Sequence, residues 1–180
     1  GKEGTPGIRG VAADVFSGLT KLKKLNASNN SFSGDLSWLK DLSALQTLRL
    51  DGNQLSGQLD LSQFSPNLTD VYLSNNKLEG NLNGISTLTN VRNLYLEHNL
   101  LSGELPAELG NCSTLSYFYL SNNNITGTIP VEVAKMNLGY SGLKLNGNRM
   151  SGEIPAEVLS SAVWKKLYPE TNIYPQQEGY

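Results

Sequence analysis

An asparagine recurs along this chain at intervals of 23 to 25 residues, and each copy occupies the same place in one apolar pattern. In the stretch LTKLKKLNASNNSFSGDL, three leucines and an alanine precede the asparagine, and phenylalanine, glycine and leucine follow it. The recurring residues are Asn30, Asn53, Asn76, Asn99, Asn123, Asn148 and Asn172. A fixed period of this length indicates that the fold is built from copies of one structural unit.

Six copies of the pattern are well formed, and they span residues 19–158. The fourth and fifth are the most complete, since each ends in glycine, an apolar residue and proline, at Pro106 and Pro130. A degenerate seventh copy is expected within residues 159–180, followed by a C-terminal cap, from Trp164, Leu167, Pro169, Asn172 and Tyr174. No linker interrupts the chain, so we expect residues 1–180 to form one domain.

Each unit is too small to bury its own leucines, so neighbouring units must stack and share one elongated core. The alternating segment around Leu-x-Leu predicts a short strand in each unit, and clusters of Gly, Asn and Ser predict turns at the corners. The recurring asparagine carries amide donors and a carbonyl acceptor, so it can satisfy backbone groups of the turns that water does not reach. The sequence therefore predicts a solenoid with identical strands stacked in parallel.

The amino end matches the second half of a repeat. Ile8 and Gly10 precede Phe32 and Gly34 by 24 residues, so residues 1–18 are expected to be a truncated first repeat. A single cysteine cannot form the internal disulfide of a stapled cap. On these grounds the sequence is expected to be a piece of something longer.

Composition and residue inventory argue against several functions. The net charge is −2, and Lys21, Lys23 and Lys24 are the only basic cluster, which gives little support for nucleic-acid binding. The longest apolar runs fall far short of the roughly 20 residues that a membrane helix needs. Cys112 is expected to be a packed thiol, and His98 has no second ligand at useful spacing. We therefore expect no enzyme, no metal site and no cofactor.

Two stretches, LEHNLLSGELPAELGNCSTL and LSNNNITGTIPVEV, resemble the plant-type leucine-rich repeat, and the resemblance covers about residues 8–158. It implies a right-handed curved coil with a concave parallel β-sheet, short second strands and 3-10 turns on the other sides. It also implies the setting of plant receptor-kinase and receptor-like ectodomains or of polygalacturonase-inhibiting proteins. The first three copies depart from the family by having Ser37, Asp60 and Asn83 in place of the proline. The family's paired cap cysteines and the Arg-x-Arg pair of some peptide-hormone receptors are absent from the sequence.

Residues that flank the buried positions of each strand are free to carry function, because their side chains point outward on the concave face. The central outward column reads Asn26, Arg49, Tyr72, Tyr95, Tyr119, Lys144 and, if the seventh copy is real, Tyr168. The flanking columns read Lys24, Thr47, Asp70, Asn93, Tyr117 and Gly142 on one side and Ser28, Asp51, Ser74, Glu97, Ser121 and Asn146 on the other. Five of the eight tyrosines fall in these columns, so the clustering needs an explanation.

Three consecutive tyrosines, Tyr72, Tyr95 and Tyr119, would form a row of adjacent rings on neighbouring strands. Tyrosine offers a large contact area at a low cost in rotamer entropy, which favours a binding surface. Cross-strand packing is the competing explanation, because neighbouring rings stabilise a sheet without any ligand. We favour binding, and the predicted ligand-binding residues are Arg49, Asp70, Tyr72, Asn93, Tyr95, Glu97, Tyr117, Tyr119 and Lys144.

Five N-glycosylation sequons occur in the sequence, although roughly three would arise by chance in a composition so rich in Asn, Ser and Thr. The candidate asparagines are Asn26, Asn29, Asn67, Asn111 and Asn124. A glycan on Asn26 would stand on the concave sheet and shift a binding site toward the carboxyl half.

The favoured function is a non-catalytic, extracellular or cell-surface recognition module that binds a protein, peptide or glycan through its concave face. A preorganised surface of this kind lowers the ordering cost of association. Nucleic acid is not an expected partner, and a membrane is expected to be involved only through segments outside this chain. The alternatives are a structural module that docks within a larger complex and, with least support, an ice-binding repeat, for which the columns are too mixed.

Overall fold

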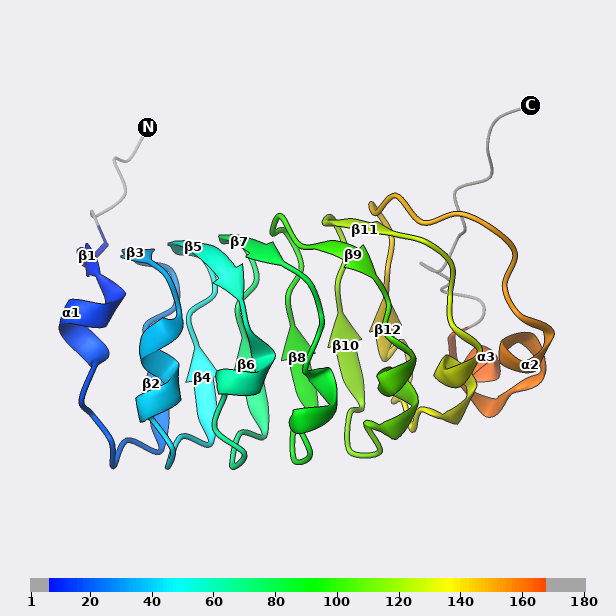
Figure 1. Ribbon diagram of the computed structural model, residues 1–180, viewed down its shortest axis with the longest axis horizontal. Coiled ribbons are helices and arrows are strands. Elements are labelled where there is room, and N and C mark those ends of the chain that lie inside the picture. Colours follow the sequence, from blue (N-terminus) through cyan, green and yellow to red (C-terminus); the bar gives the residue numbers. More distant parts are fainter. Residues whose placement is uncertain (1–6, 168–180) are drawn as a thin grey trace.

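Each repeat forms one turn of a solenoid, and successive turns lie side by side along the molecule (Figure 1). A computed structural model describes the backbone of residues 7–167 and the side chains of residues 7–164. One strand from each of six repeats joins a parallel six-stranded sheet, in which neighbours along the chain are neighbours in space. Its strands are β2 (Lys24–Asn26), β4 (Thr47–Arg49), β6 (Asp70–Tyr72), β8 (Asn93–Tyr95), β10 (Tyr117–Tyr119) and β12 (Leu143–Lys144). The predicted leucine-rich repeat solenoid is confirmed.

The register of this sheet joins equivalent positions of successive repeats. Leu48 lies opposite Leu25 on one side and Val71 on the other, and Phe118 lies opposite Leu94. These central strand residues are buried, while their neighbours along each strand are partly or fully exposed. The period-two alternation therefore separates a core face from a solvent face along the whole sheet.

Short second strands run along the edge of each turn, at the top of Figure 1. They form a four-stranded sheet of β1 (Arg9–Val11), β3 (Ser31–Gly34), β5 (Gln54–Leu59) and β7 (Lys77–Gly80), and a two-stranded sheet of β9 (Ser102–Glu104) and β11 (Asn124–Thr126). Within these sheets the glycine of one repeat pairs with the apolar residue of the next, as Gly34 does with Leu55, Gly57 with Leu78 and Gly103 with Ile125. Gly10 pairs with Phe32 in the same way, so the first strand has the place that the sequence predicted.

The third side of the solenoid carries short helical turns. In the described part of the chain, five of them are 3-10 helices: η1 (Ser37–Asp41), η2 (Leu61–Gln63), η3 (Ile85–Thr87), η4 (Ala107–Asn111) and η5 (Val131–Lys135). Pro106 and Pro130 directly precede η4 and η5 in extended conformations, with φ values of −74° and −69°. The fixed φ of proline thus directs the chain into these turns without needing a backbone donor.

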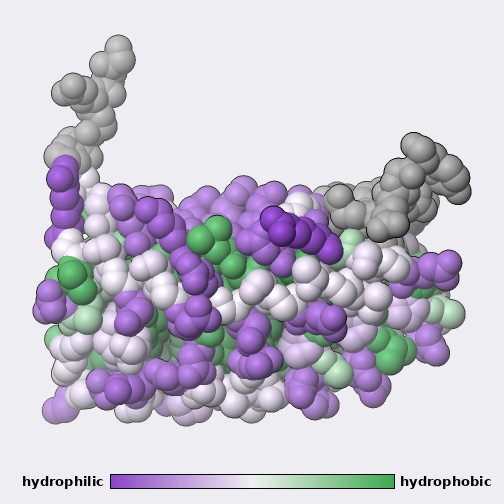
Figure 2. All heavy atoms as spheres, turned by 45° about the horizontal axis from the view of Figure 1, so that its top comes forward, coloured by the Kyte–Doolittle hydropathy of each residue, from purple (hydrophilic) through white to green (hydrophobic). Residues whose placement is uncertain are grey.

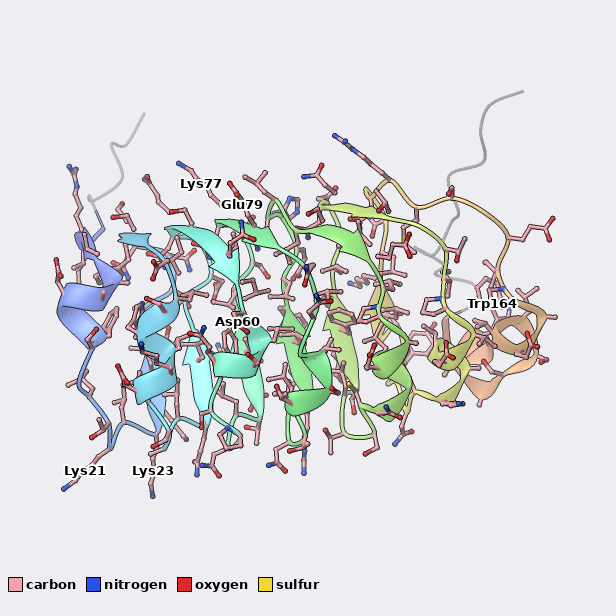
Figure 3. All side chains as sticks on the ribbon, viewed as in Figure 1. Lys21, Lys23, Asp60, Lys77, Glu79 and Trp164 are labelled. Carbon is pink, nitrogen blue, oxygen red and sulfur yellow. The ribbon has the colours of Figure 1, made fainter. Side chains whose placement is uncertain are left out.

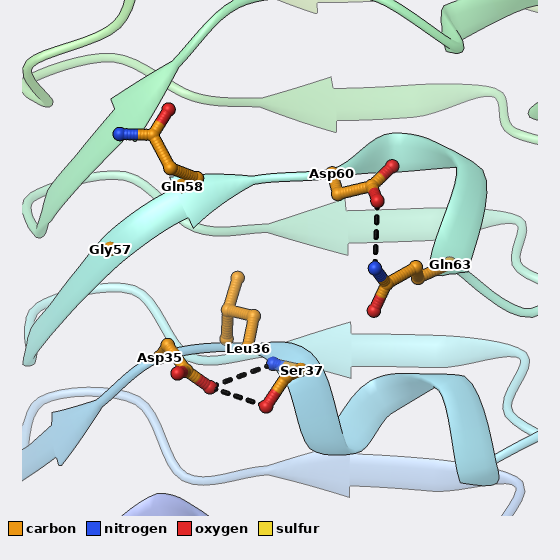
Figure 4. A pocket seen from close by; sticks show the side chains of 7 residues that line it. All are labelled: Asp35, Leu36, Ser37, Gly57, Gln58, Asp60 and Gln63. Atoms are coloured by element: carbon orange, nitrogen blue, oxygen red, sulfur yellow. Dashed lines mark hydrogen bonds between the residues drawn. The ribbon is translucent and has the colours of Figure 1, made fainter.

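In the first two repeats, which lack this proline, an aspartate carboxylate hydrogen bonds to the start of the helical turn. An Asp35 oxygen accepts hydrogen bonds from the backbone N–H and the hydroxyl of Ser37, at 2.9 and 2.6 Å. Asp60 accepts the same pair from Ser62, at 3.0 and 2.5 Å, and a third bond from Gln63 (Figure 4). The Ser37 and Ser62 hydroxyls, as the leading cause in each case, hold the pKa of Asp35 and Asp60 below the usual range. These side chains replace the proline by hydrogen bonding the start of the helical turn.

One continuous apolar core runs through the turns, and it consists mainly of the repeated leucines. Cys112 is buried in this core, as predicted, and its Sγ lies 3.7 Å from the carbonyl oxygen of Ile85. Burial raises the pKa of the Cys112 thiol. Seen with the second strands turned forward, the surface is mostly hydrophilic or neutral, with small hydrophobic areas (Figure 2). The apolar residues of the pattern thus lie chiefly inside the solenoid.

The recurring asparagines form a ladder that joins adjacent turns. The amide of Asn99 donates to the carbonyls of Leu73 and Leu96, both at 3.0 Å, and its carbonyl oxygen accepts the backbone N–H of Leu78 at 3.0 Å. Equivalent bonds recur at Asn53, Asn76, Asn123 and Asn148, and Asn30 accepts the N–H of Ile8 in the same manner. The predicted structural role of this column is confirmed for the six members within the described residues; Asn172 lies outside them.

The two ends of the described chain are helical. Helix α1 (Ala12–Phe16) follows the first strand and buries Ala12 and Phe16 against the core. At the other end lie α2 (Ala156–Ser160) and α3 (Ala162–Leu167) (Figure 1). Leu167, which the degenerate seventh copy would place in a strand, is helical, and Trp164 lies on the same helix. Pro169, Asn172 and Tyr174 of that copy lie outside the described residues.

Candidate functional site

The outward face of the six-stranded sheet brings the predicted ligand-binding residues together. Tyr72, Tyr95 and Tyr119 occupy equivalent positions in β6, β8 and β10 and lie directly opposite one another. The central column continues to Arg49 and Asn26 at one end and to Lys144 at the other. Asp70, Asn93 and Tyr117 form the neighbouring column in the same register, and Glu97 follows β8. Tyr168 lies outside the described residues.

The tyrosine ladder, defined as Tyr72, Tyr95 and Tyr119, is a row of rings in contact. The centroids of Tyr72 and Tyr95 are 4.7 Å apart, and those of Tyr95 and Tyr119 are 4.8 Å apart. Tyr117 meets Tyr119 edge to face at 6.4 Å, which widens the aromatic surface at its carboxyl end. All four rings are half-buried and keep part of their surface open to solvent. The ladder therefore packs against itself while presenting rings and hydroxyls outward.

The middle ring is the most affected by this packing. Burial raises the pKa of Tyr95 to about 12, with smaller contributions from Tyr119, Tyr72, Glu97 and Tyr117. An uncharged phenol donates and accepts one hydrogen bond each, so Tyr95 remains a hydrogen-bonding group across the physiological pH range.

A cation covers each end of the ladder. The guanidinium carbon of Arg49 lies 4.2 Å from the centroid of the Tyr72 ring, and the ammonium nitrogen of Lys144 lies 4.2 Å from the centroid of the Tyr119 ring. Both distances are within the range of cation–π attraction. Five side chains thus form one contiguous series in the order Arg49, Tyr72, Tyr95, Tyr119, Lys144.

The carboxylates on this face are held by neighbouring strands. Ser28 donates to Asp51 and Ser74 donates to Glu97, both at 2.6 Å. Asp70 accepts a hydrogen bond from Thr69 at 2.7 Å and a short one from Asn93. These bonds fix the position of negative charge beside the ladder, so the surface is ordered before any ligand arrives.

The sequence did not predict a polar groove at the edge of the six-stranded sheet where its strands begin. Its volume is about 550 Å³, and it is lined by Lys24, Gln46, Thr47, Asn67, Thr69, Asp70, Asn90, Arg92 and Thr114. The signal was present in the sequence, because the position just before each strand repeats as Gln46, Thr69 and Arg92. The groove borders Asp70 and extends the candidate surface beyond the predicted columns.

Gly139 is a second residue that the sequence did not single out. A Cβ built at this position would lie 2.7 Å from the Cζ atom of Tyr117, so only glycine leaves room for that ring in its observed place. Gly139 thus helps to set the orientation of the aromatic surface.

The other candidate positions are distributed around the solenoid. Asn26, Asn29, Asn67 and Asn111 are exposed and Asn124 is partly exposed, which is compatible with glycosylation at each sequon. Asn26 lies beside Arg49 on the outward face, as expected. His98 has a left-handed backbone with φ of 57°, like Asn75 and Asn122 at the equivalent positions of other repeats, so its role is to form the turn after the strand.

Within residues 7–164, no group of three or more His, Cys, Asp or Glu side chains is arranged to hold a metal ion. None of the helices in the described part of the chain has the length and apolar character needed to span a bilayer.

Comparisons with known proteins agree with this geometry. Leucine rich repeat family models match residues 6–55 and, separately, residues 90–112 and 114–136. No curated protein matches the chain. Among solved structures, the plant peptide hormone receptor RGFR1, in complex with RGF2, is 32% identical, with a TM-score of 0.78 over 84% of this chain and 25% of that one.

Two further solved structures show the same relationship. The Arabidopsis receptor kinase HAESA, in complex with the peptide hormone IDA and the co-receptor SERK1, is 36% identical, with a TM-score of 0.67 over 78% of this chain and 24% of that one. The BIR3–SERK2 complex from Arabidopsis thaliana contains a chain that is 32% identical, with a TM-score of 0.65 over 74% of this chain and 71% of that one. The present chain thus spans about a quarter of the RGFR1 and HAESA chains.

Proposed function

Because this chain belongs to the plant-type leucine-rich repeat proteins, we propose that it is an extracellular recognition module that binds a peptide or protein through the outward face of its six-stranded sheet. RGFR1 is a plant peptide hormone receptor and HAESA is in complex with the peptide hormone IDA, which supports a ligand of this class. The mechanism is binding without catalysis, by a surface whose shape is set by the repeat.

The contiguous series from Arg49 to Lys144 is the observation that carries the proposal. Packing alone accounts for neighbouring rings, but it does not require half-exposed tyrosines to lie between two solvent-facing cations. Tyrosine and arginine are among the residues that are enriched where binding energy is concentrated. Their backbones belong to consecutive strands of one sheet, so little order has to be gained when a ligand binds.

A triple change of Tyr72, Tyr95 and Tyr119 to serine tests the proposal. Removal of the rings should abolish capture of a binding partner from an extract of the source tissue, and the partner identified there is then purified and titrated against both proteins. We expect the affinity to fall at least a hundredfold, because several interface aromatics are lost together. Circular dichroism melting measures how much of the change is due to unfolding.

A control for this variant removes exposed apolar side chains elsewhere. Leu100 and Val131 are 48% and 41% exposed and lie outside the six-stranded sheet. The Leu100→Ser/Val131→Ser variant should retain full affinity. Retained binding by a folded triple serine variant would show that the tyrosines serve packing alone.

A docking role within a larger assembly is the second candidate. Four apolar side chains of the first turn are exposed, namely Ile8, Val11, Val15 and Leu19, with Ile8 at 66%. Such a surface can associate with another chain or another copy. Analytical ultracentrifugation of the wild-type protein and of an Ile8→Ser/Val15→Ser variant tests this candidate, since self-association that disappears in the variant would support it.

A further inference from the structure

On the outward face of the six-stranded sheet, the carboxylates have hydrogen-bond partners, whereas the two cations at the ends of the ladder have no anionic partner within the described residues. Asp51, Asp70 and Glu97 each accept a hydrogen bond from a neighbouring side chain. Within the described residues, by contrast, Arg49 and Lys144 contact the ladder through their cationic groups and form no ion pair. A guanidinium that lies over a ring keeps the N–H groups at its edge for another acceptor, and an ammonium keeps its outward donors.

The spacing of the two cations is set by the sheet. Arg49 and Lys144 are four strands apart in the register β4, β6, β8, β10, β12. At roughly 4.8 Å per strand, the backbones of these two residues lie about 19 Å apart, and the charges lie somewhat closer because both cationic groups fold inward over the terminal rings. An extended peptide advances roughly 3.3 Å per residue, so about six residues bridge this distance.

Between the two cations, the charged side chains in the columns that flank the ladder are carboxylates. Asp70 and Glu97 lie on β6 and just after β8, within the interval that Arg49 and Lys144 delimit. A polyanion with closely spaced charges, such as an acidic polysaccharide, would be attracted by the cation at each end and repelled by the carboxylates between them. A ligand with one anionic group at each end and an uncharged, hydrogen-bonding segment between them avoids that repulsion.

We propose that the ligand is an extended acidic peptide that crosses the strands, with one carboxylate at Arg49, a second about six residues away at Lys144, and uncharged residues over the tyrosine ladder. This inference rests on the function proposed above and specifies its ligand. Each peptide carboxylate forms an ion pair with one of the two cations, and the tyrosine hydroxyls hydrogen bond to the peptide backbone between them.

Selection from a phage-displayed library of random 12-residue peptides tests the inference. The wild-type chain should enrich peptides in which two acidic residues are separated by five to seven positions. Arg49→Gln and Lys144→Gln should each weaken the selected peptides about tenfold in a fluorescence-polarisation titration, since each removes one charge-assisted contact. Raising the salt concentration should reduce the binding of wild type more than that of the Arg49→Gln/Lys144→Gln double variant.

The control changes two lysines elsewhere by the same substitution. Lys21 and Lys77 point away from the body of the solenoid at opposite edges (Figure 3). The Lys21→Gln/Lys77→Gln variant has the same net charge as the double variant of the site and should bind like wild type. Equal weakening in both double variants would mean that overall charge alone is responsible, which would overturn the inference.

Two other outcomes separate the inference from the proposed function. Peptides that require Tyr95 but tolerate loss of both Arg49 and Lys144 would refute the spaced-anion ligand and leave the recognition surface intact. Peptides that bind the triple serine variant of the ladder as well as wild type would refute both. Tighter binding of an oligogalacturonate probe than of any selected peptide would replace the peptide by an acidic glycan and so contradict the inference.

Discussion

The ring of Tyr95 contacts the ring of Tyr72 across neighbouring strands, with centroids 4.7 Å apart and planes inclined by 32°. Tyr119 covers the opposite side of Tyr95 at 4.8 Å. The middle ring therefore has another ring on each side of it, while each outer ring has a cation on one side. This asymmetry gives Tyr95 a distinct titration behaviour.

Tyr95 should ionise near pH 12, about two units above an ordinary tyrosine, because its phenolate would be poorly hydrated. A folded-state pKa above the unfolded value contributes stability that is present below pH 10 and lost as the pH rises toward 12. Absorbance titration at 295 nm of wild type and Tyr95→Phe measures the difference. If the phenylalanine variant loses a group that titrates near pH 10 instead, the ring is not desolvated as described.

Asn99→Ala should be one of the most destabilising polar substitutions in the chain. It removes a buried side chain and leaves the N–H of Leu78 and the carbonyls of Leu73 and Leu96 without these partners. We expect a loss of about 2–4 kcal/mol, which lowers the melting temperature by roughly 5–15 °C.

Asn83→Ala is the matched control for that variant, because Asn83 is exposed and lies outside the asparagine ladder. Its melting temperature should change by less than about 2 °C. Similar losses in the two variants would mean that the ladder does not hold the turns together.

The sequence was sufficient to predict the repeat, the strand positions, the asparagine ladder and the central outward column, whereas Ser74, Ser121 and Gly142 of the flanking columns are buried rather than outward. The correct predictions all follow from periodicity, because a parallel stack with constant spacing places equivalent residues opposite one another, as Leu48 is opposite Leu25. The same logic predicted that Tyr72, Tyr95 and Tyr119 would be adjacent. It could not predict that Arg49 and Lys144 fold over the terminal rings, since long side chains choose among several rotamers.

Periodicity also fails where the pattern itself is weak. Leu167 fits the template for a strand but lies at the end of a helix, because the segment from Ala162 lacks the alternating apolar pair and is rich in helix formers. The capping role of Asp35 and Asp60 was also missed. Asp60 was noted only as a departure from the proline and Asp35 was not singled out, although Asp two residues before a Ser suggests such a turn.

Asp35 should make the fold sensitive to acid. Its pKa is lowered chiefly by the hydroxyl of Ser37, so its contribution is present above the ordinary carboxyl pKa and is lost as the pH falls through the folded value. Because the group is exposed, we expect an effect below about 1 kcal/mol. Urea unfolding at pH 7 and pH 3 measures it.

Asp35→Asn is the control for this effect, because it keeps an oxygen acceptor for Ser37 and does not titrate. The stability advantage of wild type over the variant at pH 7 should be smaller at pH 3. An advantage that persists unchanged at pH 3 would contradict the assigned role of the carboxylate.

Cys112 should resist thiol reagents in the folded protein. The side chain is buried, and burial raises the pKa of its thiol, so both access and thiolate fraction are low. Reaction with 5,5′-dithiobis(2-nitrobenzoate) at pH 8 should be slow in buffer and complete within minutes in concentrated guanidinium chloride. Fast labelling of the native protein would mean that the core around η4 opens readily.

Photo-cross-linking at position 95 tests the binding surface most directly. A p-benzoylphenylalanine placed at Tyr95 keeps an aromatic ring in the ladder, and the same group placed at the exposed Lys40 on η1 reports on another side of the solenoid. With the purified partner bound, irradiation should give a covalent adduct at position 95 and none at position 40. An adduct at position 40 alone, with the partner fully bound, would contradict recognition through the six-stranded sheet.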